Sequence, residues 1–146
     1  MPVPAIWGPK LWAVLHAIGA RAGIVCNKML AADEARHCIW LLEHLEQIIP
    51  CPECRQHIVA YRKEVMVPTD SKEIGLWIYT FHEAVNKRLG KAGGPPFTPA
   101  IGRNTGLLES WKEYQESIRE SVLKGSVVGH VVREWGRRYQ LWISCS

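Results

Sequence analysis

The sequence contains no apolar run of about 18 residues, which is the length that a membrane-spanning helix requires. Its first residues show no basic segment followed by an apolar stretch and a small-residue cleavage site, so we expect no Sec-type export. The 18 Lys and Arg residues are scattered and form no block interleaved with aromatic side chains. We therefore expect no membrane span, no nucleic-acid partner, and a compartment that keeps thiols reduced.

Cysteine is also sparse, with five residues in the chain. Only Cys51 and Cys54 form a Cys-x-x-Cys pair, and no second pair exists to complete a four-cysteine zinc site. Cys26, Cys38 and Cys145 are solitary. For Cys26 and Cys38, which lie in or before a helical stretch, a buried free thiol is the ordinary interpretation.

The apolar pattern predicts an all-α protein. The chain has 146 residues and 47% hydrophobic content, enough for the core of one globular domain. Apolar residues recur at intervals of three and four, and no period-two run is present. We expect helices after Pro9, from about Asp33 to Ile49, from Cys51 onward, and from Asp70 to Gly90. Four such helices joined by short loops predict a four-helix bundle.

A segment rich in glycine and proline interrupts this pattern after residue 92, and we expect a loop up to Gly106. Beyond it, one predicted helix contains Leu108, Trp111, Ile118 and Val122, and another runs from Val128 to Trp142. We therefore divide the chain into a bundle of residues 1–94 and a helical extension of residues 95–146. The extension either packs on the bundle or serves dimer or partner contacts.

The Cys51–Cys54 pair lies at a predicted helix start, because Pro52 suits the first helical position. Thiolates at such a position are stabilised by the positive end of the helix dipole. We therefore interpret the pair as a redox dithiol, and expect Cys54 to be held as a thiolate at neutral pH. Two alternatives are an inert pair, and a helical protein-interaction module in which Cys51, Cys54 and His57 bind a metal ion.

The fourth predicted helix and its end carry a polar set that suits an anionic, hydrogen-bonding ligand. This set consists of His82, Asn86, Arg88 and Lys91. Its structural interpretation is a flanking histidine with a basic helix C-terminus. Trp12 and His16, four residues apart, either stack on a planar heterocycle or fill the core. A dithiol needs an electron acceptor, and together these side chains could line a flavin site.

Three motifs in order resemble one known family. They are Trp7–Trp12 with His16 beyond it, Cys51–Cys54, and His82–Lys91. Together they cover about residues 5–92 and are similar to the Erv/ALR family of FAD-linked sulfhydryl oxidases, in particular the short forms of large DNA viruses. The resemblance implies an FAD-binding four-helix bundle, often a homodimer, that oxidises protein dithiols. Electrons would pass through Cys51 and Cys54 to FAD and then to O2, giving H2O2.

The resemblance also implies site residues, partners and a location. Cys51 and Cys54 match the active disulfide. The implied FAD contacts are Trp7, Gly8, Lys10, Trp12, His16, His82, Val85, Asn86, Arg88, Leu89, Lys91 and Trp111. The implied substrates are thiol-bearing proteins, such as a thioredoxin-like or viral redox relay protein. The implied location is the host cell cytoplasm, the virion, or both.

The chain departs from cellular members of that family in its cysteines. Tyr79 stands where a cysteine usually precedes His82, and no cysteine lies near Phe97, so the family's structural disulfide is absent. Packing must stabilise that end instead. No second Cys-x-x-Cys is present as a shuttle, so electrons enter from a partner dithiol or through Cys145.

Overall fold

The computed structural model describes residues 4–24, 28–94, 96–99 and 101–145, and Cys26 lies outside them. These residues form helices and contain no strand, so the all-α prediction is confirmed. The α-helices are α1 (Pro4–Arg21), α2 (Ala31–Glu43), α3 (Pro52–Glu64), α4 (Ile74–Arg88), α5 (Leu107–Ser117), α6 (Arg119–Leu123) and α7 (Gly129–Ser144). Short 3-10 helices are η1 (Lys28–Leu30), η2 (Leu45–Ile48) and η3 (Ser71–Glu73). Across the described ranges, no helix combines the length and apolar character that a bilayer crossing demands.

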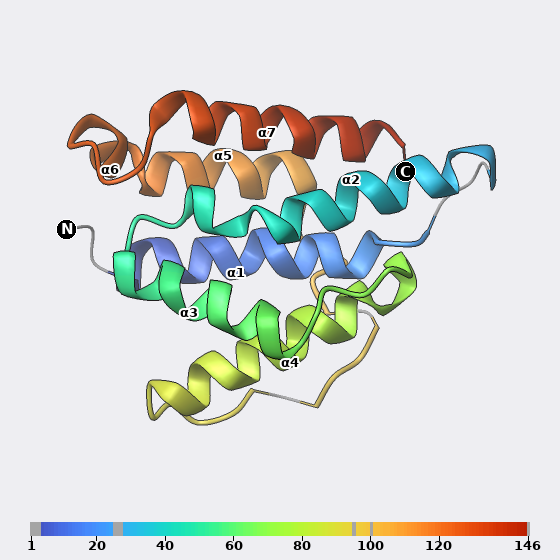
Figure 1. Cartoon of the computed structure of the whole chain (residues 1–146), viewed down its shortest axis with the longest axis horizontal. Coiled ribbons are helices and arrows are strands. Elements are labelled where there is room, and N and C mark those ends of the chain that lie inside the picture. Colours follow the sequence, from blue (N-terminus) through green and yellow to red (C-terminus); the bar gives the residue numbers. More distant parts are fainter. Residues whose placement is uncertain (1–3, 25–27, 95, 100, 146) are drawn as a thin grey trace.

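Helix α1 is central, as Figure 1 shows, with α3 and α4 below it and α2, α5 and α7 above. It packs against α4 and α5, while α2 packs against α7. It also begins earlier than predicted, because Pro9 lies inside it and not before it. Pro9 cannot donate a backbone hydrogen bond, but the additional N-terminal turns bury Trp7, whose side chain is 4% exposed. Burial of a large aromatic side chain offsets the lost hydrogen bond.

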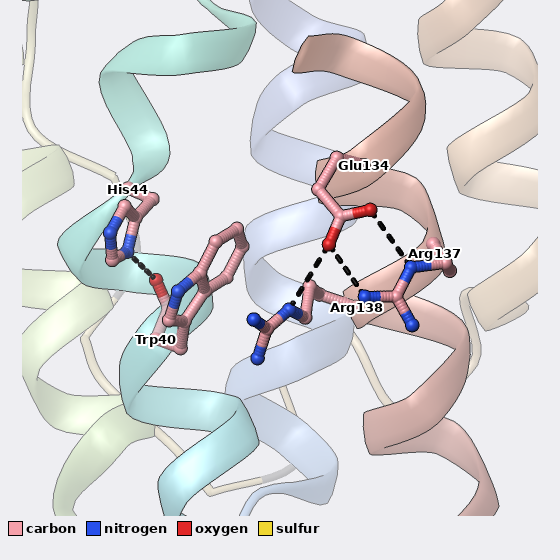
Figure 2. A network of polar contacts seen from close by, with 5 residues as sticks. All are labelled: Trp40, His44, Glu134, Arg137 and Arg138. Carbon is pink, nitrogen blue, oxygen red and sulfur yellow. Dashed lines mark hydrogen bonds and ion pairs between the residues drawn. The ribbon is translucent and has the colours of Figure 1, made fainter. Parts of the chain in front are cut away.

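The second predicted helix is interrupted at His44. The imidazole Nδ1 of His44 donates to the Trp40 carbonyl at 2.8 Å, and the two rings stack at 4.1 Å. The Arg138 guanidinium lies 4.7 Å from the Trp40 ring centroid, and Glu134 accepts hydrogen bonds from Arg137 and Arg138 (Figure 2). The chain therefore ends α2, continues as η2, and is held against α7 at this point.

The predicted helix that follows Gly106 is likewise split in two, α5 and α6. Ser117 donates its hydroxyl to the Tyr114 carbonyl at 2.6 Å, and Ile118 donates its backbone N–H to the same carbonyl. This local competition ends α5 at Ser117, and α6 begins at Arg119. Gly125, with a φ of 79°, then turns the chain toward α7.

The hydrophobic core is continuous across the predicted boundary at residue 94. Trp135 donates its indole N–H to the Leu41 carbonyl at 3.0 Å. Glu34 is fully buried, and its carboxyl oxygens accept from Gly23, Ser71 and Trp142. The division into a bundle and an extension stays a prediction, and the two parts share one core.

A close backbone contact sets the spacing of α1 and α4. A Cβ atom on Gly75 would lie 2.9 Å from the Gly19 carbonyl oxygen, which leaves no room for a side chain. The two helices therefore approach as near as their backbones allow. This contact lies one turn from His16 and two turns from His82, the residues that face each other farther along the same pair of helices.

Candidate functional site

A cavity of about 480 Å³ lies between α1, α3 and α4. Its walls are mainly apolar and aromatic, and cationic and amide side chains gather toward the end of α4. The lining residues are Trp7, Gly8, Pro9, Leu11, Trp12, Ile49, Cys54, His57, Phe81, His82, Val85, Asn86, Arg88, Leu89 and Lys91. An apolar cavity with a few convergent polar groups is the usual form of a small-molecule site.

The dithiol lies at the start of α3, as predicted. Cys51 is the N-cap residue with an extended backbone, and Pro52 is the first helical residue. The backbone N–H of Cys54 points to the Cys51 Sγ at 3.3 Å. Both thiols are free and partly exposed, but only Cys54 lines the cavity. The dithiol thus joins the cavity, through Cys54, to the surface, through Cys51.

The protonation of Cys54 differs from the expectation. Burial, together with the nearby Cys51 sulfur, raises the pKa of the Cys54 thiol to about 11, and the Arg88 guanidinium opposes the rise. In the reduced pair Cys54 is therefore protonated at neutral pH, and the prediction of a standing thiolate is wrong. The helix N-terminus does not prevent this, because its first-turn N–H is directed at the other sulfur.

Trp12, His16 and His82 form one cluster. Trp12 and His82 line the cavity, and His16 contacts His82 without lining it. The Trp12 and His82 rings stack at 3.8 Å with 9° between their planes. His16 Nε2 and His82 Nδ1 lie 2.9 Å apart and share a hydrogen bond. Burial lowers the pKa of His16 to about 4, with a further contribution from His82, and burial also lowers the pKa of His82. Both imidazoles are thus neutral at pH 7.

The lowered pKa of His16 predicts a loss of stability in acid. The unfolded chain binds a proton at His16 below about pH 6.5, whereas the folded chain resists protonation until about pH 4. The free energy of unfolding therefore has its full value above pH 6.5 and decreases as the pH falls toward 4, because only the unfolded chain takes up the proton. We expect the urea midpoint to fall over this window, and to fall less in His16→Gln.

The control is His130→Gln, because His130 is an exposed histidine on α7. It should retain the pH dependence of the unmodified chain. Equal slopes of midpoint against pH in His16→Gln and the unmodified chain would contradict the assignment.

Positive charge gathers where the chain leaves α4. Gly90, with a φ of 70°, reverses the chain so that Lys91 donates its backbone N–H to the Asn86 carbonyl at 2.8 Å. Lys91 forms no ion pair within the described ranges, and Arg88 lies 4.0 Å from one Glu53 carboxyl oxygen. Two cations and an amide at one end of an apolar cavity suit a ligand with phosphate groups.

A buried donor on α1 is unsatisfied. The indole Nε1 of Trp7 is buried and has no hydrogen-bond partner in the part of the chain that the structure describes. Trp7 is also a lining residue of the cavity, and a buried donor without a partner would gain a hydrogen bond from an acceptor atom of a molecule bound there. The residues present thus fit a planar heterocycle with acceptor atoms, joined to phosphates.

Comparison with protein families matches residues 9–101 to the Erv1 / Alr family. The chain belongs to the Erv1/Alr family. Two relatives, both FAD-linked sulfhydryl oxidases of African swine fever virus isolates, are 29% identical over 119 residues and 30% identical over 120 residues. Each match covers 81% of this chain and 84% of the relative. A protein of Invertebrate iridescent virus 3 is 29% identical over 91 residues, 60% of this chain and 59% of its own length. No solved structure matches significantly.

This Erv1/Alr chain fills the place of the missing structural disulfide with an aromatic pair. The Tyr79 and Phe97 rings meet edge to face with centroids 5.4 Å apart. These are the positions at which the resemblance calls for cysteines. The expectation that packing stabilises this end is therefore met by a specific contact between α4 and the following loop.

The structure brings most of the predicted Erv1/Alr site residues together. His16 contacts the cavity wall through His82, while Lys10 and Trp111 lie elsewhere. The Lys10 ammonium is 3.3 Å from Glu113 at the surface, and Trp111 is buried against Trp135 of α7.

Sequence reasoning missed several apolar lining residues of the Erv1/Alr cavity. Pro9, Ile49 and Phe81 line the cavity, although none of them is among the FAD contacts that the resemblance implies. A core stripe and a cavity wall have the same helical periodicity, so the pattern alone holds no signal that separates them. Only Ile49 carries such a signal, because it lies two residues before Cys51 and is therefore close to the dithiol.

Cys145 lies far from the dithiol. Helix α7 has 16 residues, about 24 Å at 1.5 Å per residue, and Cys145 follows its far end. The first turn of α7 adjoins the turn that contacts α3, so direct exchange between Cys145 and Cys51 within one chain is excluded (Figure 1).

A metal site at the dithiol has no support in the geometry. His57 Nε2 lies 3.8 Å from Glu53, and the described residues contain no group of three metal-binding side chains. The metal-binding alternative is not favoured.

Proposed function

We propose that this Erv1/Alr protein is an FAD-dependent thiol oxidase that forms disulfide bonds in protein substrates through Cys51 and Cys54. One observation carries the proposal: Cys54 of a helix-start dithiol lines a cavity suited to a planar, phosphate-bearing cofactor. The names of the African swine fever virus relatives support the same activity.

Residues of the cavity would hold the FAD. Trp7, Trp12 and His82 offer aromatic faces and a free indole N–H to its ring systems, and Arg88 and Lys91 offer charge to its phosphates. Further proposed contacts are Gly8, Val85, Asn86 and Leu89, with His16 positioning His82. When bound, FAD supplies a two-electron acceptor for dithiol oxidation.

The cysteine pair performs the exchange with substrate. A substrate thiolate attacks the Cys51 Sγ of the Cys51–Cys54 disulfide, and a mixed disulfide forms as Cys54 leaves. Cys54 then takes up a proton, because burial raises its pKa to about 11. The second substrate thiol attacks the substrate sulfur of the mixed disulfide and releases Cys51 as a thiol. The substrate has lost two electrons and two protons, and the cysteine pair has gained them.

We further propose O2 as the final acceptor, which takes two electrons and two protons to give H2O2. The proposed substrates are thiol-bearing proteins, and the proposed assembly is a homodimer, both on the family resemblance. Because the relatives named above are viral, we propose a host-cytoplasmic or virion location.

The visible absorption spectrum tests this function. The purified protein is expected to be yellow, to bleach when dithiothreitol is added without oxygen, and to regain its colour when air is admitted. The metal content is measured on the same sample. A colourless protein with stoichiometric zinc would refute the oxidase and support the metal-binding module.

A further inference from the structure

The turn between α6 and α7 is tied to the first turn of α3. Arg55 donates its backbone N–H to the Cys51 carbonyl at 3.0 Å, and its guanidinium donates to the Ser126 carbonyl at 3.0 Å. Figure 1 shows the α6–α7 turn and the start of α3 at the same end of the molecule. The turn lies outside residues 9–101, the part of the chain that matches the Erv1/Alr family.

A groove of about 190 Å³ opens next to this turn. Its apolar lining includes Ile118, Val122, Leu123 and Val132. The Leu123 side chain is 80% exposed, and Val128 at the start of α7 is 52% exposed. We call this depression, with Leu123 and Val128 at its edge, the α6–α7 groove. Exposed apolar residues gathered beside a reactive site are typical of an interaction surface.

Some cationic side chains around the α6–α7 groove have carboxylate partners, and others have none. Arg119 lies 3.8 Å from Glu116, and Lys124 lies 2.8 Å from Glu120, so these two cations have local counterions. Arg133 lines the groove and forms no ion pair within the described part of the chain. Arg55, whose guanidinium reaches the Ser126 carbonyl in the adjoining turn, has no carboxylate partner there either. An acidic partner would meet two uncompensated guanidinium groups there.

We propose that the α6–α7 groove docks a segment of the substrate protein that carries an apolar side chain flanked by acidic residues. The apolar side chain enters the groove against Leu123, and the acidic residues face Arg133 and Arg55. The substrate thiols are thereby held near Cys51. This proposal rests on the proposed thiol oxidase function and names the feature by which that site selects its substrate.

Two synthetic dithiol peptides of equal length test the docking. One carries Asp-Leu-Glu and the other Lys-Leu-Lys, each joined by the same flexible spacer to a Cys-x-x-Cys segment. The FAD-loaded protein should oxidise the acidic peptide with a kcat/KM about tenfold above that of the basic peptide. The variant Leu123→Asp/Arg133→Glu should lose this preference and should oxidise dithiothreitol at an unchanged rate.

The controls separate the possible failures. Leu76→Asp changes a leucine of α4 that is 50% exposed and lies outside the groove, and it should retain the preference. Arg133→Gln provides a milder variant, expected to reduce the preference through the acidic peptide's KM. Unchanged peptide preference in both groove variants would overturn the docking. So would a change from dimer to monomer with unaltered peptide kinetics, because the groove would then be a contact between copies. Failure of the unmodified protein to oxidise dithiothreitol would instead refute the oxidase.

Discussion

Replacing Cys54 with serine is expected to abolish dithiol oxidation while FAD stays bound. Cys54 is the cysteine of the pair that lines the cavity, and a serine hydroxyl cannot form the disulfide. Loss of a residue that carries the covalent step lowers turnover by about a thousandfold or more. The measurement is the rate of oxygen uptake with dithiothreitol, together with the ratio of visible to ultraviolet absorbance as a measure of bound FAD.

Two further variants define the role of the pair. Cys51→Ser should be equally inactive, because substrate attack at the surface requires that sulfur. Cys145→Ser should retain full turnover with dithiothreitol, since Cys145 lies beyond the far end of α7. Turnover of Cys54→Ser at the unmodified rate would contradict the assignment of Cys51 and Cys54 as the redox pair. A loss of FAD from both Cys51→Ser and Cys54→Ser would contradict it as well.

The double substitution His82→Ala/Lys91→Ala is expected to weaken FAD binding about a hundredfold. In the proposed site the His82 ring, held in place by Trp12, packs against a ring system of FAD, and such aromatic stacking contributes about 1 kcal/mol. A charge-assisted contact from Lys91 to phosphate contributes about 2 kcal/mol. Together they amount to about 3 kcal/mol, which corresponds to about two orders of magnitude in the dissociation constant. Quenching of flavin fluorescence on titration into the flavin-free protein measures this constant.

The matched control is His130→Ala/Lys87→Ala, which removes an exposed histidine and an exposed lysine that do not line the cavity. It should bind FAD as the unmodified chain does. Thermal denaturation of the flavin-free proteins distinguishes a weakened site from a destabilised fold, because His82 also bonds to His16. Unchanged FAD occupancy in the His82/Lys91 variant would show that the cofactor lies elsewhere.

Much of the fold follows from local rules. Pro52 after a cysteine predicts where α3 begins, and Gly90 marks the end of α4, where its φ is 70°. Asp70 accepts the Lys72 backbone N–H at 3.0 Å, as a capping residue should, although one 3-10 turn precedes α4. These features depend on a few neighbouring residues, and the sequence shows them directly.

The parts that could not be predicted depend on burial. Helix α1 extends past Pro9 because Trp7 finds a place in the core, and no local signal at Pro9 reveals this. The raised pKa of Cys54 arises from the protein packed around it, and opposes what the helix start alone would predict. Phe81 is similar, because its place in the sequence pattern is that of a core residue and only the structure shows that it lines the cavity.

The buried carboxyl group of Glu34 has a consequence for how the protein is made. Its donors Gly23, Ser71 and Trp142 lie 11, 37 and 108 residues away along the chain. A ribosome delivers the N-terminal segments first, so the last donor is synthesised long after the helices that form the cavity. Until Trp142 arrives, one oxygen of Glu34 must stay in water or remain unsatisfied. The nascent chain therefore completes the core around Glu34 only when α7 leaves the ribosome, after the helices that form the cavity have been made.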